Sequence, residues 1–254
     1  RTGRLWIGTF NGGLSCHEEG QFTCYRAEDG LGSSGVLDIL EDKQGDLWVG
    51  TWNGLARFRD GKFTAFSTAD GLKGQSVWTL CAASGGDIWI GTGSGLNRLH
   101  DGRFRSFTLR DGLPNNVVRK VYVDRDGELW IGTIGGGLCH FQDGKPVNYT
   151  TREGLADNKV RTIHQDRHGS LWIGTWGGLS RLRDGRLTSY TKRDGLPHDF
   201  VEVLFEDREG SLWIGTHGGG LARLRDGKFS IYTTKEGLVD NLAKCVFESR
   251  DGSL

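Results

Sequence analysis

Short apolar stretches alternate with glycine-rich polar turns along the whole chain, and none longer than one strand has helical periodicity. In one representative period the apolar stretches lie at 118–123, 128–133, 138–142 and 145–151. Apolar runs of this length, bounded by turn residues, predict β-strands. The last two are joined by Asp143-Gly144, a pair typical of a tight β-hairpin. Each period therefore predicts four antiparallel strands, which we call strands A to D in chain order.

The pattern recurs with a nearly constant period. A Leu-Trp-Ile-Gly-Thr motif or a close variant occurs six times in strand B, with tryptophans 42, 41, 41, 42 and 41 residues apart. The motif tryptophans are Trp6, Trp48, Trp89, Trp130, Trp172 and Trp213. Such a period marks structural units that bury apolar surface only against their neighbours, and we expect the tryptophan to fill the wedge between units. The sequence predicts an all-β fold, a six-bladed β-propeller of four-stranded antiparallel blades forming a single domain over residues 1–254.

The two chain ends carry complementary strands. The first repeat begins in the turn before strand B, and the chain ends in the same turn of the next period. We therefore expect residues Ala243–Ser249 to supply a strand A that pairs with Leu5–Thr9 and closes the ring. The alternative is an arc of a seven-bladed or longer propeller. Because the chain lacks methionine, we expect it to be a processed, excised or engineered segment.

Charge, the length of apolar runs and cysteine content limit the partners and cross-links to be expected. The 32 Lys and Arg residues balance the 32 Asp and Glu residues, so we expect no nucleic-acid partner. No apolar run reaches the roughly 20 residues of a membrane span, which predicts no direct membrane insertion. The five cysteines form no CxxC, and hairpin pairing would place Cys16 and Cys24 on opposite sheet faces. We interpret all five as small core residues without a disulfide.

Candidate binding residues lie where the repeats differ. The B–C and D–A loops leave one end of each blade, and variation on a fixed scaffold is typical of binding surfaces. The candidates follow the motif threonine, take the second position of strand A, or lie in a D–A loop; they are Phe10, Trp52, Trp78, Arg119, Arg161, Trp176, His198 and His217. Aromatic faces beside Arg and Asn groups suit a sugar ring or another planar amphipathic ligand. The alternative is that these aromatics cover the blade ends as packing.

The sequence offers little for catalysis. The seven histidines form neither HxxxH nor HxH, and there is no nucleophile elbow or phosphate loop. Asp124-Arg-Asp126-Gly has half the spacing of a calcium loop, but the equivalent turns lack it, so we interpret it as a structural turn. We therefore predict no catalytic residue, no metal site and no cofactor.

Two stretches carry a resemblance to a known family. Asp-Arg-Asp-Gly-Glu-Leu-Trp-Ile-Gly-Thr at 124–133, with the following Gly-Gly-Leu, and Arg-Asp-Gly-Leu-Pro-Asn-Asn-Val at 110–117 resemble the two-component regulator propeller repeat. The resemblance covers all six repeats. In that family such repeats build periplasmic sensor domains of bacterial regulators, often hybrid histidine kinases. The family usually has seven blades and a following immunoglobulin-like domain, whereas we expect six blades and no such domain within residues 1–254.

The resemblance implies a non-catalytic ligand-sensing propeller in the periplasm or outside the cell. Its expected partners are a small molecule or oligosaccharide and a parent signalling chain. One alternative is a protein-interaction or assembly scaffold. A minor alternative is a propeller lyase, because a lyase that opens cyclic antibiotics is similar in repeat style and uses histidines with a glutamate.

Overall fold

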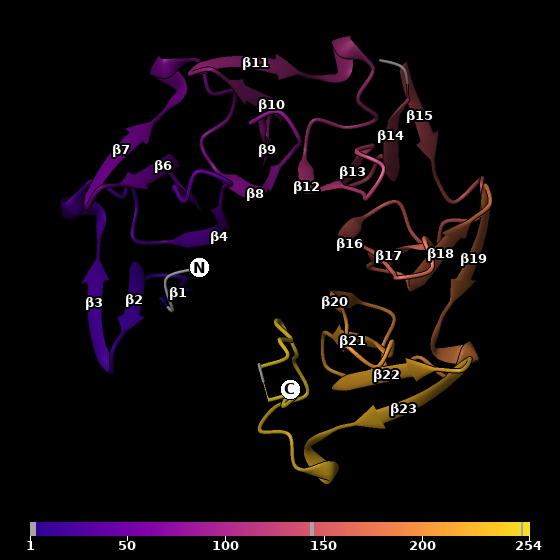
Figure 1. Ribbon diagram of the computed structural model, residues 1–254. Coiled ribbons are helices and arrows are strands. Elements are labelled where there is room, and N and C mark those ends of the chain that lie inside the picture. Colours follow the sequence, from indigo (N-terminus) through magenta and orange to yellow (C-terminus); the bar gives the residue numbers. More distant parts are fainter. Residues whose placement is uncertain (1–3, 143–144, 250) are drawn as a thin grey trace. The chain divides into compact units, whose positions relative to one another are not determined.

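The computed structural model describes residues 4–142, 145–249 and 251–254. It divides into two compact units, Arg1–Gly127 and Glu128–Leu254, each of which is described by itself. Regular structure in the described residues consists of 23 strands and five one-turn 3₁₀ helices. The strands form one three-stranded and five four-stranded sheets, and within each sheet neighbours in sequence are neighbours in space (Figure 1). This meander of antiparallel strands is the predicted blade.

The first unit contains twelve strands and the first three 3₁₀ helices. The strands are β1 (Leu5–Gly8), β2 (Leu14–Glu18), β3 (Gln21–Tyr25), β4 (Val36–Glu41), β5 (Leu47–Thr51), β6 (Gly54–Arg59), β7 (Lys62–Phe66), β8 (Val77–Ala82), β9 (Ile88–Thr92), β10 (Gly95–His100), β11 (Arg103–Phe107) and β12 (Val118–Val123). The 3₁₀ helices are Ala27–Asp29, Thr68–Asp70 and Leu109–Asp111. The boundary between the units falls in the turn after β12, which is the strand A of its sheet.

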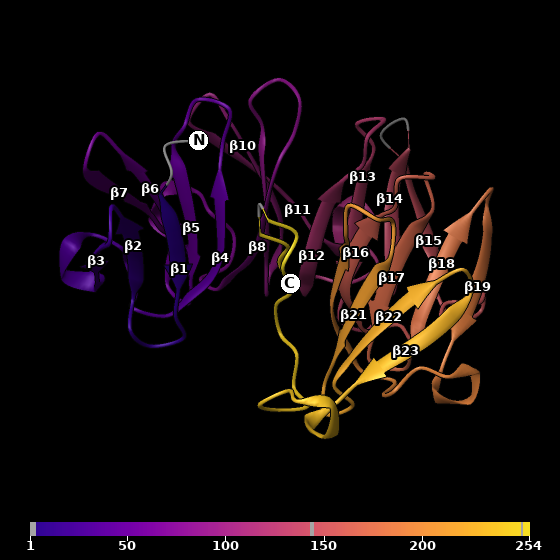
Figure 2. The ribbon, with the colours of Figure 1, turned by 60° about the horizontal axis from the view of Figure 1, so that its bottom comes forward.

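The second unit contains eleven strands and two 3₁₀ helices. The strands are β13 (Leu129–Thr133), β14 (Leu138–Gln142), β15 (Lys145–Tyr149), β16 (Val160–Gln165), β17 (Leu171–Thr175), β18 (Leu179–Arg183), β19 (Arg186–Tyr190), β20 (Val201–Glu206), β21 (Leu212–Thr216), β22 (Leu221–Arg225) and β23 (Lys228–Tyr232). The 3₁₀ helices are Lys192–Asp194 and Thr234–Glu236. Figure 2 shows the turn between β22 and β23 at one end of these strands and the last 3₁₀ helix at the other.

The predicted strands are confirmed with small changes at their ends. Strand B begins at Leu129 rather than 128, and strand D ends at Tyr149 rather than 151. Strand D stops because a Ser or Thr followed three residues later by Asp or Glu forms a capping box. Ser67 Oγ accepts from Ala69 N (3.2 Å), and Asp70 Oδ2 accepts from Ser67 N (2.8 Å). These polar groups end the strand and begin the D–A loop in five repeats, while Arg26 takes the place of the Ser or Thr in the first.

The hairpins between strands C and D have positive φ at both turn residues, as predicted. Asp60 and Gly61 have φ values of 49° and 78°, and the four other described hairpins agree closely. These are the angles of a two-residue turn that matches the twist of a hairpin. The predicted turn at Asp143-Gly144 lies outside the described residues.

The motif tryptophan fills the wedge between blades and is held by the A–B turn. Trp48 packs in a buried cluster with Leu80 and Ile90 of the following blade. Its Nε1 donates to Asp42 Oδ2 at 2.8 Å, and the Oδ1 of the same carboxylate accepts from Gln44 N. Equivalent bonds join Trp172 to Asp166 and Trp213 to Asp207. The turn aspartate therefore has a structural role, as the sequence indicated.

The motif glycine allows the next blade to approach closely. A methyl group on Gly50 would lie 2.7 Å from Val77 Cγ1, and one on Gly174 would lie 2.6 Å from Val201 Cγ1. Both valines begin the strand A of the following blade. Because such distances are too short for a real side chain, glycine is required at this contact.

The last segment of the second unit follows the path of an inner strand. Ala243 lies against Gly215 as Val201 lies against Gly174, and Glu248 Oε2 accepts from Arg208 N at 3.0 Å. Ala243–Ser249 nevertheless has no strand assignment. Its pairing with Leu5–Thr9, and with it the single closed domain, stays a prediction.

The cysteines were only partly predicted. Cys16 pairs with Thr23 and Ser15 with Cys24, which confirms the register, and all five thiols are free. Cys16 and Cys139 are buried, but Cys24 and Cys245 are exposed, so their interpretation as core residues was wrong. Cys24 lies on the face of the β1–β3 sheet that no other blade covers within the first unit, where Leu5 is also 56% exposed.

Candidate functional site

A β-bulge occupies the second position of strand A. In β8, Val77 pairs with Thr92 and Thr79 pairs with Gly91, so that Trp78 is passed over. The same shift passes over Arg161 in β16 and Glu202 in β20. A bulge re-aims the side chain of the extra residue relative to the alternation of the strand. The candidate position on strand A is therefore set by a backbone device that the repeats share.

The residue after the motif threonine is fixed beside the start of strand A. Trp52 N donates to Gly35 O (3.2 Å), Trp176 N to Lys159 O (3.1 Å) and His217 N to Phe200 O (3.0 Å). Each bond joins the B–C loop to the last residue before strand A of the same blade. Bulge residues and loop residues consequently gather at the B–C/D–A end of the blades.

The first unit brings four candidates together in a row, which we call the aromatic ladder: Phe10, Trp52, Trp78 and Arg119. The Phe10 and Trp52 rings meet edge to face with centroids 5.7 Å apart, and Trp52 meets Trp78 in the same way at 5.8 Å. Arg119 Cζ lies 4.5 Å from the centroid of the Trp78 ring. Phe10 is 66% exposed and Trp52 36% exposed. The ladder thus offers accessible aromatic surface beside a cation.

The second unit carries a different cluster, centred on a carboxylate. Glu202 Oε2 accepts from Arg161 Nε (2.7 Å), and its Oε1 lies 2.9 Å from His217 Nδ1. Phe200 stacks on His217 with centroids 4.9 Å apart, and its ring lies 5.0 Å from that of Trp176. We call these five residues the Glu202 network.

The environment of Glu202 keeps it ionised. Burial alone would raise the pKa of the Glu202 carboxyl, but hydrogen bonds from His217 and Arg161 outweigh burial and hold the pKa below its usual range. The residue is only 8% exposed. Glu202 is therefore a fixed negative charge that orients one cation and one imidazole.

The sequence prediction missed Glu202 and Phe200. Glu202 occupies the same bulge position as Trp78 and Arg161, so the repeat alignment contained the signal. A carboxylate does not belong to the aromatic and cationic residue types from which the candidates were predicted. Phe200 precedes strand A directly, at a position with no aromatic in the aligned repeats.

His198 has a local role in its loop. Its Nδ1 accepts from Phe200 N at 3.0 Å, much as Asn115 Oδ1 accepts from Val117 N (2.8 Å) in another D–A loop. Side-chain to backbone bonds of this kind order turns. These contacts place His198 in the loop scaffold, next to the Glu202 network through Phe200.

The arrangement suits binding by stacking and charge. Lys159 Nζ lies 4.5 Å over the Trp176 ring, so each unit combines an aromatic face with a cation at this end. Across the part of the chain that the structure describes, no three His, Cys, Asp or Glu side chains gather as a metal-binding group. In the same residues no helix has the length and apolar character needed to cross a bilayer.

Comparison with known families identifies the repeats. The antiparallel meanders with their interlocking Trp and Gly define the class as a β-propeller protein. A family model described as two component regulator propeller matches residues 30–53, 71–94, 112–135, 154–177 and 195–218. The chain is thus a two-component regulator propeller-repeat protein, with five of its six periods matching that model. A comparison with curated protein sequences gives no match.

Solved structures show the same fold. The extracellular domain assigned to a hybrid two-component system of B. thetaiotaomicron is 26% identical, with a TM-score of 0.84 over 98% of this chain and 36% of its own. This chain thus spans about a third of that domain. PorZ, a surface component of the type-IX secretion system of Porphyromonas gingivalis, is 18% identical with a TM-score of 0.73, over 95% of this chain and 42% of its own. A virginiamycin B lyase of Staphylococcus aureus is also 18% identical, with a TM-score of 0.72 over 91% and 80%. At 18% identity these two show the fold alone.

Proposed function

We propose that this chain is a non-catalytic, ligand-sensing part of the extracellular or periplasmic region of a two-component regulator. The repeats of that family and the 26% identical extracellular domain support this assignment. The ligand binds at the B–C/D–A end of the blades, where the repeats differ. The partner is a parent signalling chain, whose activity responds to ligand binding.

The observation that carries the proposal is the aromatic ladder of the first unit. Trp52 and Phe10 present accessible ring faces, and Arg119 lies over the next ring along. A sugar ring stacks its apolar face on such aromatics, while a guanidinium binds hydroxyl or carboxylate oxygens. An oligosaccharide therefore fits the ladder better than a wholly apolar ligand does.

The second unit offers a separate and more polar candidate site of its own, the Glu202 network. Arg161 and His217 are oriented by one carboxylate, and Trp176 is 42% exposed beside them. A pre-oriented donor loses little freedom on binding, which favours affinity. The lyase alternative rests on a likeness of fold alone, and we assign His217 and Glu202 a binding role.

The test begins with a panel of neutral and acidic oligosaccharides in a thermal-shift screen, followed by calorimetry on any ligand that stabilises the protein. Trp52→Ala should weaken binding of a ligand held by the first unit about 30-fold, equivalent to roughly 2 kcal/mol for an anchor residue, and Trp176→Ala should do the same for a ligand held by the second unit. Arg208→Ala in an A–B turn at the opposite end is the matched control and should leave affinity unchanged.

Two outcomes would contradict the proposal. Unchanged affinity in both tryptophan variants, or a loss confined to Arg208→Ala, would place the site elsewhere. A protein that melts at the same temperature with every member of the panel would favour the scaffold alternative.

A further inference from the structure

In five of the six repeats a basic side chain from strand C lies on the motif tryptophan. The strand register places Arg57, Arg98, Arg181 and Arg223 opposite Trp48, Trp89, Trp172 and Trp213. The guanidinium carbons lie 5.7, 5.9, 5.2 and 5.8 Å from the respective ring centroids. In the fourth repeat His140 stacks on Trp130 with centroids 4.0 Å apart. A flat cationic or imidazole group on the indole is thus a regular part of this fold.

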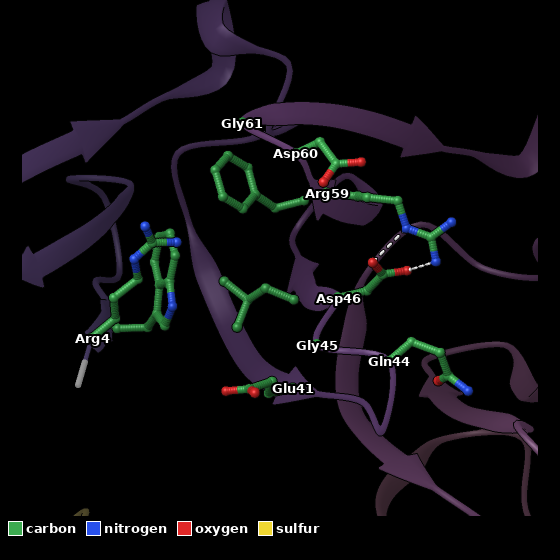
Figure 3. A pocket seen from close by; sticks show the side chains of 11 residues that line it. Arg4, Glu41, Gln44, Gly45, Asp46, Arg59, Asp60 and Gly61 are labelled. Carbon is green, nitrogen blue, oxygen red and sulfur yellow. Dashed lines mark hydrogen bonds and ion pairs between the residues drawn. The ribbon is translucent and has the colours of Figure 1, made fainter. Parts of the chain in front are cut away.

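The first repeat departs from this rule. The residue opposite Trp6 is Cys16, whose thiol is too small to cover the indole. A cavity of about 620 Å³ opens there, lined by Trp6, Cys16, Tyr25 and Phe58 among others. A second cavity of about 560 Å³ adjoins it and shares Arg4, Trp6 and Phe58 (Figure 3). We call the two together the Trp6 pocket.

The walls of the Trp6 pocket are aromatic. The Trp6 ring lies 6.0 Å from Tyr25 and 5.4 Å from Phe58, and the latter two rings are 5.4 Å apart. Three rings from β1, β3 and β6 therefore converge on one place, all within the first unit. Converging aromatic faces are attractive to cations because the faces carry negative partial charge.

The rim of the Trp6 pocket has an excess of negative charge. The described lining holds five carboxylates and two guanidinium groups; they are Glu18, Glu19, Glu41, Asp46, Asp60, Arg4 and Arg59. Figure 3 shows Arg4 on one side of the opening and the Arg59–Asp46 ion pair on the other. Arg4 Nε donates to Glu18 Oε2 at 2.8 Å, so its guanidinium is held at the rim by that carboxylate. The charge of the lining is complementary to a cation.

We propose that the Trp6 pocket binds the guanidinium group of an arginine side chain supplied by another molecule. The incoming group takes the place on Trp6 that Arg57 takes on Trp48 in the next repeat. A guanidinium fits better than an ammonium because it stacks flat on an indole and binds carboxylates with two parallel hydrogen bonds. This site lies at the turn end of the blades and is independent of the ligand site proposed above.

The binding test uses acetyl-Gly-Arg-Gly-amide, followed through the indole N–H resonance of Trp6, which Trp6→Phe identifies. The matched peptide with citrulline, which has the shape of arginine without its charge, should bind at least tenfold more weakly. The lysine peptide should also be weaker. N-acetylarginine carries a carboxylate that the acidic rim repels and has no compensating ammonium group, so tighter binding of the tripeptide supports a polypeptide source and the reverse order overturns that part.

The decisive variant is Cys16→Arg, which restores the side chain of the other repeats and fills the pocket from within. It should raise the melting temperature and lower peptide affinity at least tenfold. Cys24→Arg adds the same charge on the opposite face of the same sheet and should leave affinity unchanged. Trp52→Ala should likewise have no effect.

The proposal is overturned if the citrulline or lysine peptide binds as tightly as the arginine peptide. It is overturned equally if Cys16→Arg keeps wild-type affinity, if Cys24→Arg loses it, or if the arginine peptide gives no saturable shift of the Trp6 resonance.

Discussion

The two units place different chemistry on the same backbone device. In the first unit the bulge residue is Trp78, and its neighbours are aromatic rings and one guanidinium. In the second unit the bulge residues include Arg161 and Glu202, which form an ion pair with a separation of 2.7 Å. The backbone geometry is repeated, and only the side chain at one position decides whether the local cluster stacks or pairs charges.

In both units the residues that hold the blades together are distinct from those proposed to bind ligand. Trp48 in the first unit and Trp172 and Trp213 in the second are buried and bonded to turn aspartates. The aromatic residues at the B–C/D–A end of the blades are partly exposed, and their rings contact one another between loops, as Phe10 contacts Trp52 and Trp176 contacts Phe200. A repeat protein can therefore vary the residues at the B–C/D–A end without disturbing the tryptophans packed between its blades. Substitutions at the two kinds of position should therefore differ in their effect on stability.

The largest expected difference in stability is between substitution of a tryptophan packed between blades and substitution of one at the B–C/D–A end of the second unit. Trp172 is 5% exposed and packs in a cluster with Leu204 and Ile214, so Trp172→Ala should cost about 3–5 kcal/mol of unfolding free energy through the cavity it leaves. Trp176→Ala, at a site 42% exposed, should cost below about 1 kcal/mol. Urea denaturation measures both, and equal losses would contradict the separation.

A smaller loss is expected from Glu202→Gln. The substitution keeps the shape of the side chain but leaves Arg161 without its charged partner, which should cost about 1–3 kcal/mol. The matched variant in the first unit is Phe10→Ala, whose ring is 66% exposed and whose loss should stay within about 0.5 kcal/mol. If Glu202→Gln proves as mild as Phe10→Ala, the network does not stabilise the second unit.

Glu202 should make the stability of the second unit depend on pH, whereas the Trp78 cluster of the first unit should not. The pKa of Glu202 is depressed in the folded state, so its contribution is complete above the ordinary Glu pKa of about 4.3. It is lost as the pH falls through the folded-state value. The stability difference between wild type and Glu202→Gln should therefore shrink below about pH 4. The difference between wild type and Trp78→Phe should stay constant over the same range, and a parallel decline would exclude Glu202 as the cause.

The smallest effect concerns the cation in the aromatic ladder. Arg119→Gln removes the charge over Trp78 and should cost about 0.5–1 kcal/mol. Arg119→Lys should recover part of it, because an ammonium is also attracted to the ring face. Denaturation curves of the two variants give the comparison. If the Gln variant is as stable as wild type, the charge of Arg119 over the Trp78 ring does not contribute to stability.

The sequence by itself determined the strands, their order and the wedges. The Trp motif, the Asp-Gly hairpins and the Ser/Thr-x-x-Asp/Glu loops act over a few residues, so each local pattern has one structural solution. Repetition then fixed how neighbouring blades pack within each unit, since Gly50 beside Val77 recurs as Gly174 beside Val201. The candidate position on strand A was also found from the alignment of the repeats.

Only the tertiary structure decided what those positions do. Trp78 and Trp52 lie 26 residues apart in sequence and meet because a bulge and a loop bring them to one end of neighbouring blades. Glu202 became the centre of a network because His217 and Arg161 converge on it from two other segments. The consequence of Cys16 appeared only once the register set it opposite Trp6. Local patterns specify backbone geometry, but the partners of a side chain depend on distances between segments that are far apart in the sequence, and packing alone sets those distances.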